Sequence, residues 1–263
     1  MATTIDQLGR IIKVTQSPVR IISLVPSLTE LLFELGLNDE VAAITKFCIH
    51  PHNWQQSKIK IGGTKNLNLE KIISIQPDLI IANKEENVEM QVRKLMEDFP
   101  VWVSDINKLQ DAVEMIVEIS KIVGKETIGR EMETILERNF KSLGRTGKKI
   151  TCAYLIWDKP MMTVGGDTFI SNMLEYAGFT NVFNEKSRYP EITVEEIEKM
   201  APNVLFLSSE PFPYFNKLID QYKTDFPKTK IQLVDGEMFS WYGSRLLKSP
   251  SYFLHLKEKF GYD

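Results

Sequence analysis

From Arg20 onward the chain alternates between two kinds of hydrophobic pattern. Short apolar runs rich in β-branched residues are typical of strands buried on both faces, and amphipathic stretches with apolar residues at helical spacing follow them. The predicted buried strands are residues 20–25, 41–45, 79–82, 101–103, 150–156, 204–208 and 231–234. Strands that alternate with helices place a parallel sheet between helical layers, so the pattern predicts an α/β fold.

A helix start follows the first predicted strand directly. Residues 27–30 read Ser-Leu-Thr-Glu, the pattern of a capping box, immediately after Pro26, and Gly36 ends the apolar run. We therefore expect Ser27 to cap this helix. Because ligands of open parallel sheets bind at the carboxyl ends of the strands, Pro26 and Ser27 are candidate site residues.

The alternation is interrupted near the middle of the chain by a long amphipathic stretch. Apolar residues recur at helical spacing over residues 125–143, and Gly144 and Gly147 follow before the next strand. One helix of roughly 28 Å is expected here, at 1.5 Å per residue. The pattern is compatible with a helix that covers a sheet and with one that joins two domains.

An internal repeat favours the second interpretation. Residues 68–81 align without gaps with residues 193–206, and both copies carry a helix cap, a carboxylate two residues later, an Ile, a Pro and then a hydrophobic strand. The caps and carboxylates are Asn68 and Glu70 in the first copy, and Thr193 and Glu195 in the second. Coincidence remains the alternative, because this order is common in α/β proteins.

The repeat predicts the domain organisation. We expect an N-terminal α/β lobe over residues 1–124, a connecting helix over 125–143 and a C-terminal α/β lobe over 144–263. A disulfide between Cys48 and Cys152 is then not expected, since the two residues fall in opposite lobes and a bridge needs Cα atoms within about 7 Å.

Composition and charge exclude several classes of function. The 263 residues contain 32 basic and 35 acidic side chains, and a net charge of −3 argues against binding to nucleic acid or to an anionic membrane. No apolar run approaches the roughly 20 residues of a membrane span, and the residues from Met1 onward do not read as an export signal. With two cysteines and three histidines, neither a disulfide framework nor an all-protein zinc site is expected.

Several ordered motifs together resemble one known family. They are RIISLVPSLTELLFELG at residues 20–36, GGTKNLNLEKI at 62–72, QPDLIIA at 76–82, GGDTF at 165–169 and AGFTNVF at 177–183. In these motifs the chain is similar to the substrate-binding proteins of ABC importers for cobalamin, haem and ferric siderophores.

The resemblance implies an architecture and a role. It implies two Rossmann-like lobes with parallel sheets, one long backbone helix between them, a ligand cleft between the lobes and little closure on binding. It implies no catalysis and no cofactor, with a metal chelate as cargo, and a monomeric protein in the periplasm or cell envelope. It also implies that Glu70 and Glu195 dock onto arginines of the permease dimer. The alternative is that both are first-turn acids that only complement the helix dipole.

Loops at the strand ends carry the candidate ligand-binding residues. Aromatic side chains suit the apolar faces of a flat macrocycle, whereas cations suit propionate, phosphate or siderophore oxygens. The aromatic candidates are Trp157, Phe212, Tyr214, Trp241 and Tyr242, the cationic ones are Lys65 and Arg245, and Pro26, Ser27 and Asn66 complete the set. The aromatic residues could equally cover a core, and the cations could be solvated charges.

One local cluster has metal-ligand chemistry. Cys48 and His50 lie in the segment Cys-Ile-His-Pro-His and could supply an axial ligand to haem iron or cobalt. A buried free cysteine beside a histidine is the alternative. Free zinc or manganese is disfavoured, because the chain lacks a set of several histidines.

Three functions therefore compete at this stage. The first is a solute-binding protein that delivers a tetrapyrrole or a ferric siderophore to an ABC importer. The second is a cytosolic carrier or sensor of a metal chelate, which the missing export signal would favour. The third is a two-lobed enzyme such as a chelatase, but the sequence has no dinucleotide-binding, P-loop or nucleophile-elbow motif.

Overall fold

The computed structural model describes residues 2–144, 150–212 and 216–261. The chain divides into two compact units. Unit 1 comprises Met1–Ile106, Gln110–Leu136 and Trp241–Arg245, and unit 2 comprises Asn107–Leu109, Glu137–Ser240 and Leu246–Asp263. The segment Trp241–Arg245 thus belongs to unit 1, although it lies near the C-terminus of the sequence.

Unit 1 is built on a parallel sheet. Its order is β5 (Ile59–Lys60), β4 (Val41–Ile44), β3 (Ile21–Ser23), β8 (Leu79–Asn83) and β9 (Val101–Ser104), and all neighbours run parallel. All residues of β3, β8 and β9 are buried, as expected of strands covered on both faces. The α/β class and the strands predicted in this half are confirmed.

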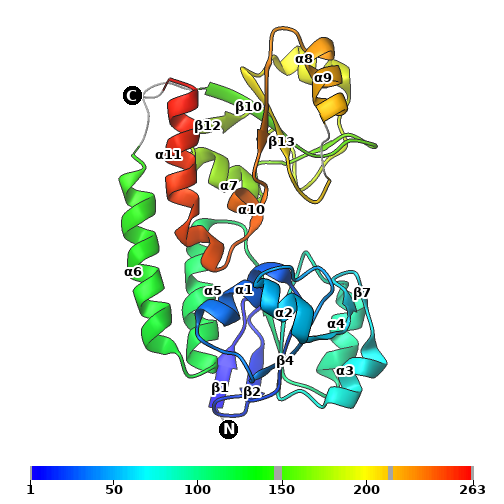
Figure 1. The fold of residues 1–263 in the computed structure, drawn as a ribbon, viewed down its shortest axis with the longest axis vertical. Helices are drawn as coiled ribbons and strands as arrows, with labels where there is room; N and C mark the ends of the chain where they lie inside the picture. Colours follow the sequence, from blue (N-terminus) through cyan, green and yellow to red (C-terminus); the bar gives the residue numbers. More distant parts are fainter. Residues whose placement is uncertain (1, 145–149, 213–215, 262–263) are drawn as a thin grey trace. The chain divides into compact units, whose positions relative to one another are not determined.

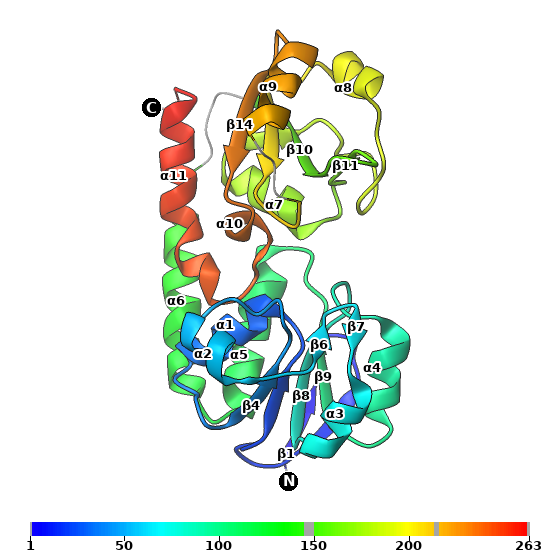
Figure 2. The same cartoon turned by 45° about the vertical axis from the view of Figure 1, so that its right-hand side comes forward.

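Helices cover both faces of this sheet (Figure 1, Figure 2). Helices α1 (Pro26–Glu34) and α2 (His52–Ser57) lie on one face, and α3 (Leu69–Ile75) and α4 (Glu89–Met96) lie on the other. Right-handed crossovers require this arrangement, because the chain leaves β3 in one direction and β8 in the opposite direction. The carboxyl ends of β3 and β8 therefore form a topological switch point, where parallel sheets bind ligands.

The capping box predicted for the first helix is wrong. Helix α1 begins at Pro26, and its N-cap is Val25, which makes no side-chain cap. Proline suits the first helical position because its φ is already helical and it has no N–H to satisfy. The helix consequently starts two residues earlier than predicted, and Ser27 lies inside it. The Ser27 hydroxyl is buried and has no hydrogen-bond partner among the described residues.

Two short hairpins complete the strands of unit 1. Strands β1 (Ala2–Ile5) and β2 (Ile11–Val14) pair antiparallel, as do β6 (Gly62–Gly63) and β7 (Asn66–Leu67). Neither hairpin was predicted, because these strands are short and their apolar positions are few. Helix α5 (Leu109–Ile122) follows β9.

Unit 2 contains a mostly parallel sheet of order β11 (Met162–Thr163), β10 (Ile150–Trp157), β13 (Val204–Ser208) and β14 (Lys230–Val234). Strand β12 (Phe179–Asn181) pairs parallel with the start of β10, and β11 pairs antiparallel with its end. The three longer strands are the ones predicted from the sequence. Strands β11 and β12 are too short to show a hydrophobic period.

Alternate residues of the central strands face two separate cores. Towards α8 (Val194–Met200) and α9 (Asn216–Asp225), Ala153 and Leu155 pack in a cluster with Leu205 and Leu207. The opposite face, covered by α7 (Phe169–Tyr176), α10 (Glu237–Ser240) and α11 (Ser249–Lys259), is aromatic (Figure 1). There Tyr154 and Phe206 lie in ring contact with Phe239, at centroid distances of 5.4 and 6.4 Å. The strand period of two thus fills both layers.

The long helix predicted over residues 125–143 is present as α6 (Glu126–Ser142). The division between the units falls within it, after Leu136. At its C-terminal end Phe140 packs against Tyr176 and Phe253, and the Lys257 ammonium donates to the Leu143 carbonyl at 2.9 Å. Among the described helices, none has both the length and the apolar character needed to cross a bilayer.

Candidate functional site

The loops at the carboxyl edge of the unit 1 sheet are held together by side-chain amides. The Asn83 carboxamide oxygen accepts from the amides of Glu85 and Glu86 at 2.8 and 2.9 Å, which shapes the loop after β8. The Asn87 amide donates to the carbonyls of Leu24 at 3.3 Å and Thr64 at 3.1 Å. These bonds join the end of β3, the β6–β7 hairpin and the loop after β8 into one edge.

The segment Trp241–Arg245 lies against this edge. The Arg245 guanidinium binds the Glu30 carboxylate at both oxygens, with Nε to Oε2 at 3.0 Å and a terminal nitrogen to Oε1 at 2.8 Å. Both residues are buried, at 8% and 5% exposure. Gly243 approaches α1 so closely that an added Cβ would lie 2.5 Å from the Ser27 carbonyl oxygen. Only glycine allows this contact.

The aromatic residues of the segment contact two loops of the edge. The Trp241 ring packs edge-on against His50 at 5.5 Å, and the Arg245 guanidinium lies 5.1 Å from the Trp241 ring centroid. The Tyr242 hydroxyl donates to the Glu86 carboxylate at 2.7 Å. The structure thus gathers Trp241, Tyr242 and Arg245 with His50 at the carboxyl edge of the unit 1 sheet, whereas the sequence had placed these three residues in the C-terminal lobe. All three segment residues are buried, and the charge of Arg245 is directed at Glu30.

Cys48 lies beneath this edge as a protonated thiol. Its side chain is fully buried, and the hydroxyls of Thr29 and Thr45 lie 3.0 and 3.2 Å from the sulfur. Burial raises the pKa of the Cys48 thiol, and a protonated thiol is a poor metal ligand. Within residues 2–144, 150–212 and 216–261, no three His, Cys, Asp or Glu side chains are grouped so that they could hold a metal ion. Cys152 is also a free, buried cysteine, and it belongs to unit 2.

The sequence reasoning missed the exposed apolar residues of the loop after β4. Phe47 and Ile49 are 52% and 42% exposed, one on each side of buried Cys48. The Lys46 ammonium lies 5.0 Å from the Phe47 ring centroid. The ring also covers Gly63, where an added Cβ would meet it at 2.9 Å. The sequence feature that could have identified them is the presence of two apolar residues in the loop after a predicted buried strand.

Lys65 and Asn66 lie on the neighbouring β6–β7 hairpin. Both are exposed, and the Lys65 ammonium donates to the Glu85 carbonyl. Lys65 therefore bridges the hairpin to the loop after β8. Pro26 is half-buried at the end of β3.

The carboxyl edge of the unit 2 sheet carries an aromatic pair. Trp157 at the end of β10 is 37% exposed, and its ring packs edge-on against Phe212 at 5.4 Å. The Trp157 indole N–H donates to the Lys159 carbonyl at 3.1 Å, which fixes the ring. Tyr214 lies outside the described residues.

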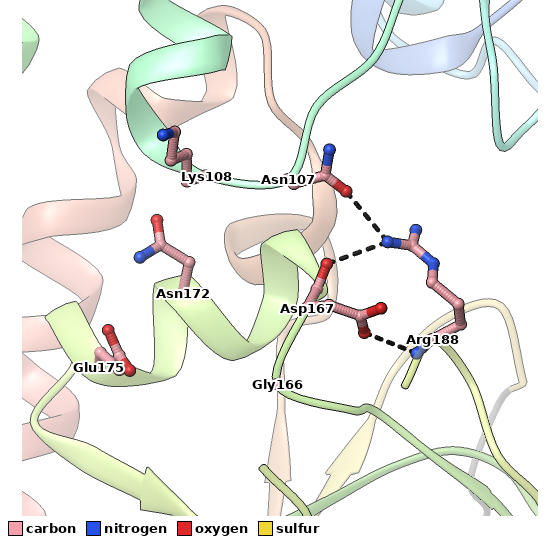
Figure 3. Close-up of a pocket in the computed structure, with 7 residues that line it drawn as sticks. All are labelled: Asn107, Lys108, Gly166, Asp167, Asn172, Glu175 and Arg188. Atoms are coloured by element: carbon pink, nitrogen blue, oxygen red, sulfur yellow. Dashed lines mark hydrogen bonds between the residues drawn. The ribbon is translucent and has the colours of Figure 1, made fainter. Parts of the chain in front are cut away.

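Unit 2 also contains a cavity of about 410 Å³ that sequence reasoning did not assign (Figure 3). Its lining residues are Asn107, Lys108, Gly166, Asp167, Asn172, Glu175 and Arg188. The Arg188 guanidinium donates to the Asn107 carboxamide at 3.0 Å and to the Asp167 carbonyl at 2.9 Å. Two cationic side chains and two carboxylates line this cavity, so its formal charge favours neither a cationic nor an anionic ligand.

The two carboxylates predicted to dock onto a permease are both exposed in first helical turns. Glu70 lies in α3, which Asn68 caps through a 2.9 Å bond from the Lys71 amide. Glu195 lies in α8, whose cap is Thr193. A hydrogen bond with the Thr193 side chain lowers the pKa of Glu195 from its ordinary value of 4.5. Glu70 belongs to unit 1 and Glu195 to unit 2.

Comparison with known proteins agrees with this architecture. The family model described as periplasmic binding protein matches residues 21–232, which is most of the chain. The vitamin B12-binding protein of Vibrio campbellii is 28% identical over 213 residues, covering 79% of this chain and 77% of the relative.

Solved structures show the same fold. The periplasmic vitamin B12 binding protein of Vibrio cholerae has a TM-score of 0.78 at 20% identity, covering 92% of this chain and 99% of its own. The periplasmic heme binding protein of the same organism has a TM-score of 0.77 at 20% identity, covering 91% and 99%. The family model matches this chain over most of its length. The chain therefore belongs to the periplasmic binding protein family, the substrate-binding components of transport systems.

Proposed function

We propose that this chain captures a metal chelate in the cell envelope and delivers it to the permease of an ABC importer. The preferred candidate for this ligand is a corrinoid, and haem and a ferric siderophore are the alternatives. The observation that carries the proposal is the exposed apolar pair Phe47 and Ile49 in the loop after β4, at the carboxyl edge of the unit 1 sheet and next to the switch point between β3 and β8. Family membership supports the transport role. The names of the relatives, which bind vitamin B12 or haem, support the class of ligand.

The chemistry of the two edges suits such a cargo. A chelate macrocycle has broad apolar faces, which favour aromatic surfaces such as Phe47 in unit 1 and the Trp157–Phe212 pair in unit 2. Its periphery carries amides, phosphate or carboxylates, for which exposed Lys46 and Lys65 offer ammonium groups. The buried, protonated thiol of Cys48 offers the metal no thiolate, so we do not expect Cys48 to bind the metal of the chelate.

Ligand titration tests the first half of the proposal. The full chain is titrated with cyanocobalamin, haemin and ferrichrome by absorbance, and with molybdate by calorimetry as a different ligand class. We expect one chelate to bind in a 1:1 ratio, and Phe47→Ala to weaken it about tenfold, as expected for loss of an aromatic contact.

The control for Phe47→Ala is Val19→Ala. Val19 is 62% exposed and lies just before β3, at the amino edge of the sheet, and its replacement should leave affinity unchanged. Failure of all three chelates to bind, or binding of molybdate alone, would contradict the proposed ligand class.

The second half of the proposal assigns docking to Glu70 and Glu195. Each is exposed and held in a first turn, where the helix dipole favours its charge, and an exposed acid of this kind contributes little to the stability of the fold. Glu70→Ala and Glu195→Ala should therefore leave ligand affinity and Tm nearly unchanged but reduce pull-down of the cognate permease. Glu70→Lys should reduce it further, because like charges then face each other.

Glu198→Ala is the matched control, since Glu198 is exposed on the same helix as Glu195 but beyond its first turn. It should not affect pull-down. If Glu70→Ala and Glu195→Ala lose ligand binding while docking persists, these acids belong to the ligand site and the docking assignment is wrong.

A further inference from the structure

We infer that Glu30 is a positioning residue for ligand binding: its buried ion pair with Arg245 fixes the segment Trp241–Arg245 on unit 1 and, through it, the two loops of the proposed ligand edge. The inference rests on the proposed function for its link to ligand affinity. Its structural part, the placement of Trp241, stands independently.

The ion pair of Glu30 with Arg245 is unusual for a buried position. Glu30 is buried, as are Leu28, Leu31 and Leu32 of the same helix α1. An ion pair in such surroundings costs desolvation of both charges, and apolar residues of similar volume often give equal or greater stability. What the pair supplies instead is geometry, because a bidentate guanidinium–carboxylate contact fixes both distance and orientation.

The segment needs an anchor because its chain neighbours belong to the other unit. Ser240 before it and Leu246 after it are both part of unit 2. Its placement on unit 1 therefore depends on its own contacts. Gly243 against Ser27 sets the approach, and Arg245 with Glu30 is the charged contact that holds it to α1.

From the anchor, contacts lead to both loops of the edge. Arg245 lies over the Trp241 ring, and that ring packs against His50 in the loop that carries Phe47 and Ile49. On the other side, Tyr242 binds Glu86, next to the Glu85 carbonyl that Lys65 contacts. A shift of the segment would therefore displace two neighbouring loops together. One is the loop that carries Phe47 and Ile49, and the other is the loop after β8 that Lys65 contacts.

Nuclear magnetic resonance and ligand titration on the full chain test this inference. The indole N–H resonance of Trp241, assigned with Trp241→Phe, reports the position of the segment without ligand. Cyanocobalamin and haemin are the ligand probes. At a temperature where the variants are folded, Glu30→Gln should shift the Trp241 resonance. It should also lower the affinity for the chelate by about tenfold or more, as expected when the positioning of a contact is lost.

Asp6→Asn is the matched control. Asp6 is a buried carboxylate of the same unit that pairs with Arg10 and accepts from the Leu8 and Val103 amides. Its replacement should lower Tm but leave the Trp241 resonance and the chelate affinity at their wild-type values. Equal effects of Asp6→Asn on resonance and affinity would overturn the inference, because general destabilisation would then explain both.

A double variant separates stability from positioning and also serves if Glu30→Gln fails to fold. Glu30→Met with Arg245→Met removes both buried charges and should restore Tm to near the wild-type value. We expect the Trp241 resonance to remain shifted and affinity to remain reduced. Wild-type resonance and affinity in this variant would overturn the inference. If the wild-type chain binds neither probe, the corrinoid and haem assignment fails, whereas the resonance still decides whether the ion pair positions the segment.

Discussion

The two copies of the internal repeat have the same backbone design. Residues 68–81 form the cap, α3 and β8, and residues 193–206 form the cap, α8 and β13. Both helices end on a non-glycine residue in the left-handed region, Gln76 at φ 52° and Ala201 at φ 44°. Each is followed by a proline, which disfavours a right-handed helical conformation of the residue before it. The repeat seen in the sequence is thus a structural one.

The copies also share the bond that connects the helix to the sheet. Asp78 accepts from the amides of Val19 and Arg20 at 2.9 and 2.8 Å, at the start of β3. Asn203 accepts from the Thr151 amide at 2.9 Å, at the start of β10. In each unit the strand of the repeat then pairs with that neighbour in parallel.

The copies differ in where side chains support the helix. In the second copy Thr193 and Glu196 form a complete capping box at the N-terminus, and Lys186 binds Glu196 at 2.8 Å. In the first copy the Gln76 side chain donates to the Ile73 carbonyl at 2.9 Å, at the C-terminus. The difference teaches that the order of cap, proline and Asx residue sets the backbone, whereas the additional side-chain bonds can be placed at either end.

The largest expected difference lies in the connecting bond. Asp78→Ala should lower the free energy of unfolding by about 2 kcal/mol and Asn203→Ala by about 1 kcal/mol, because hydrogen bonds to a charged group are the stronger. Urea denaturation of both variants measures this. Equal losses would show that the charge of Asp78 adds nothing to the shared design.

The left-handed residues should give a smaller difference, of opposite sign. Ala201→Gly should raise the free energy of unfolding by up to about 1 kcal/mol, because glycine removes the steric cost of a positive φ. Gln76→Gly should change it by less than about 0.5 kcal/mol, since the gain is offset by loss of the bond to the Ile73 carbonyl. Thermal and urea denaturation decide between the two, and a larger gain at Gln76 would contradict the comparison.

The smallest expected effect is a change in the pKa of Glu195. The Thr193 hydrogen bond lowers the pKa of Glu195 from 4.5, so Thr193→Ala should raise it towards 4.5, whereas Asn68→Ala should leave it unchanged. Because the folded pKa is the lower one, the stabilisation from this carboxylate is complete above pH 4.5 and is lost as pH falls through the folded value. Carbon-detected titration of the glutamate carboxyls measures it, and an unaltered Glu195 in Thr193→Ala would exclude this hydrogen bond as the cause.

Residues at strand ends were predicted as ligand contacts, and this role stays a prediction. Trp157 and Phe212 come from such loops and form a ring pair, whereas Trp241 and Tyr242, expected in the C-terminal lobe, belong to unit 1. Phe47 and Ile49 were not predicted as site residues, because no local sequence pattern shows that they are exposed while Cys48 between them is buried. The burial that protonates Cys48 depends on Thr29 and Thr45, which no local pattern links to it.

The sequence by itself determined the longer parallel strands, helix α6 and the paired copies of the repeat, because these depend on apolar spacing, helix caps and prolines within a few residues of one another. The tertiary structure alone decided that Trp241–Arg245 belongs to unit 1 and that Arg245 binds Glu30, 215 residues away. It also decided that Ser27 lies inside α1 and that a cavity forms around Arg188. The physical reason is that a local pattern specifies which residues are buried, whereas the partner of a buried charge is chosen by segments that meet only in the folded chain.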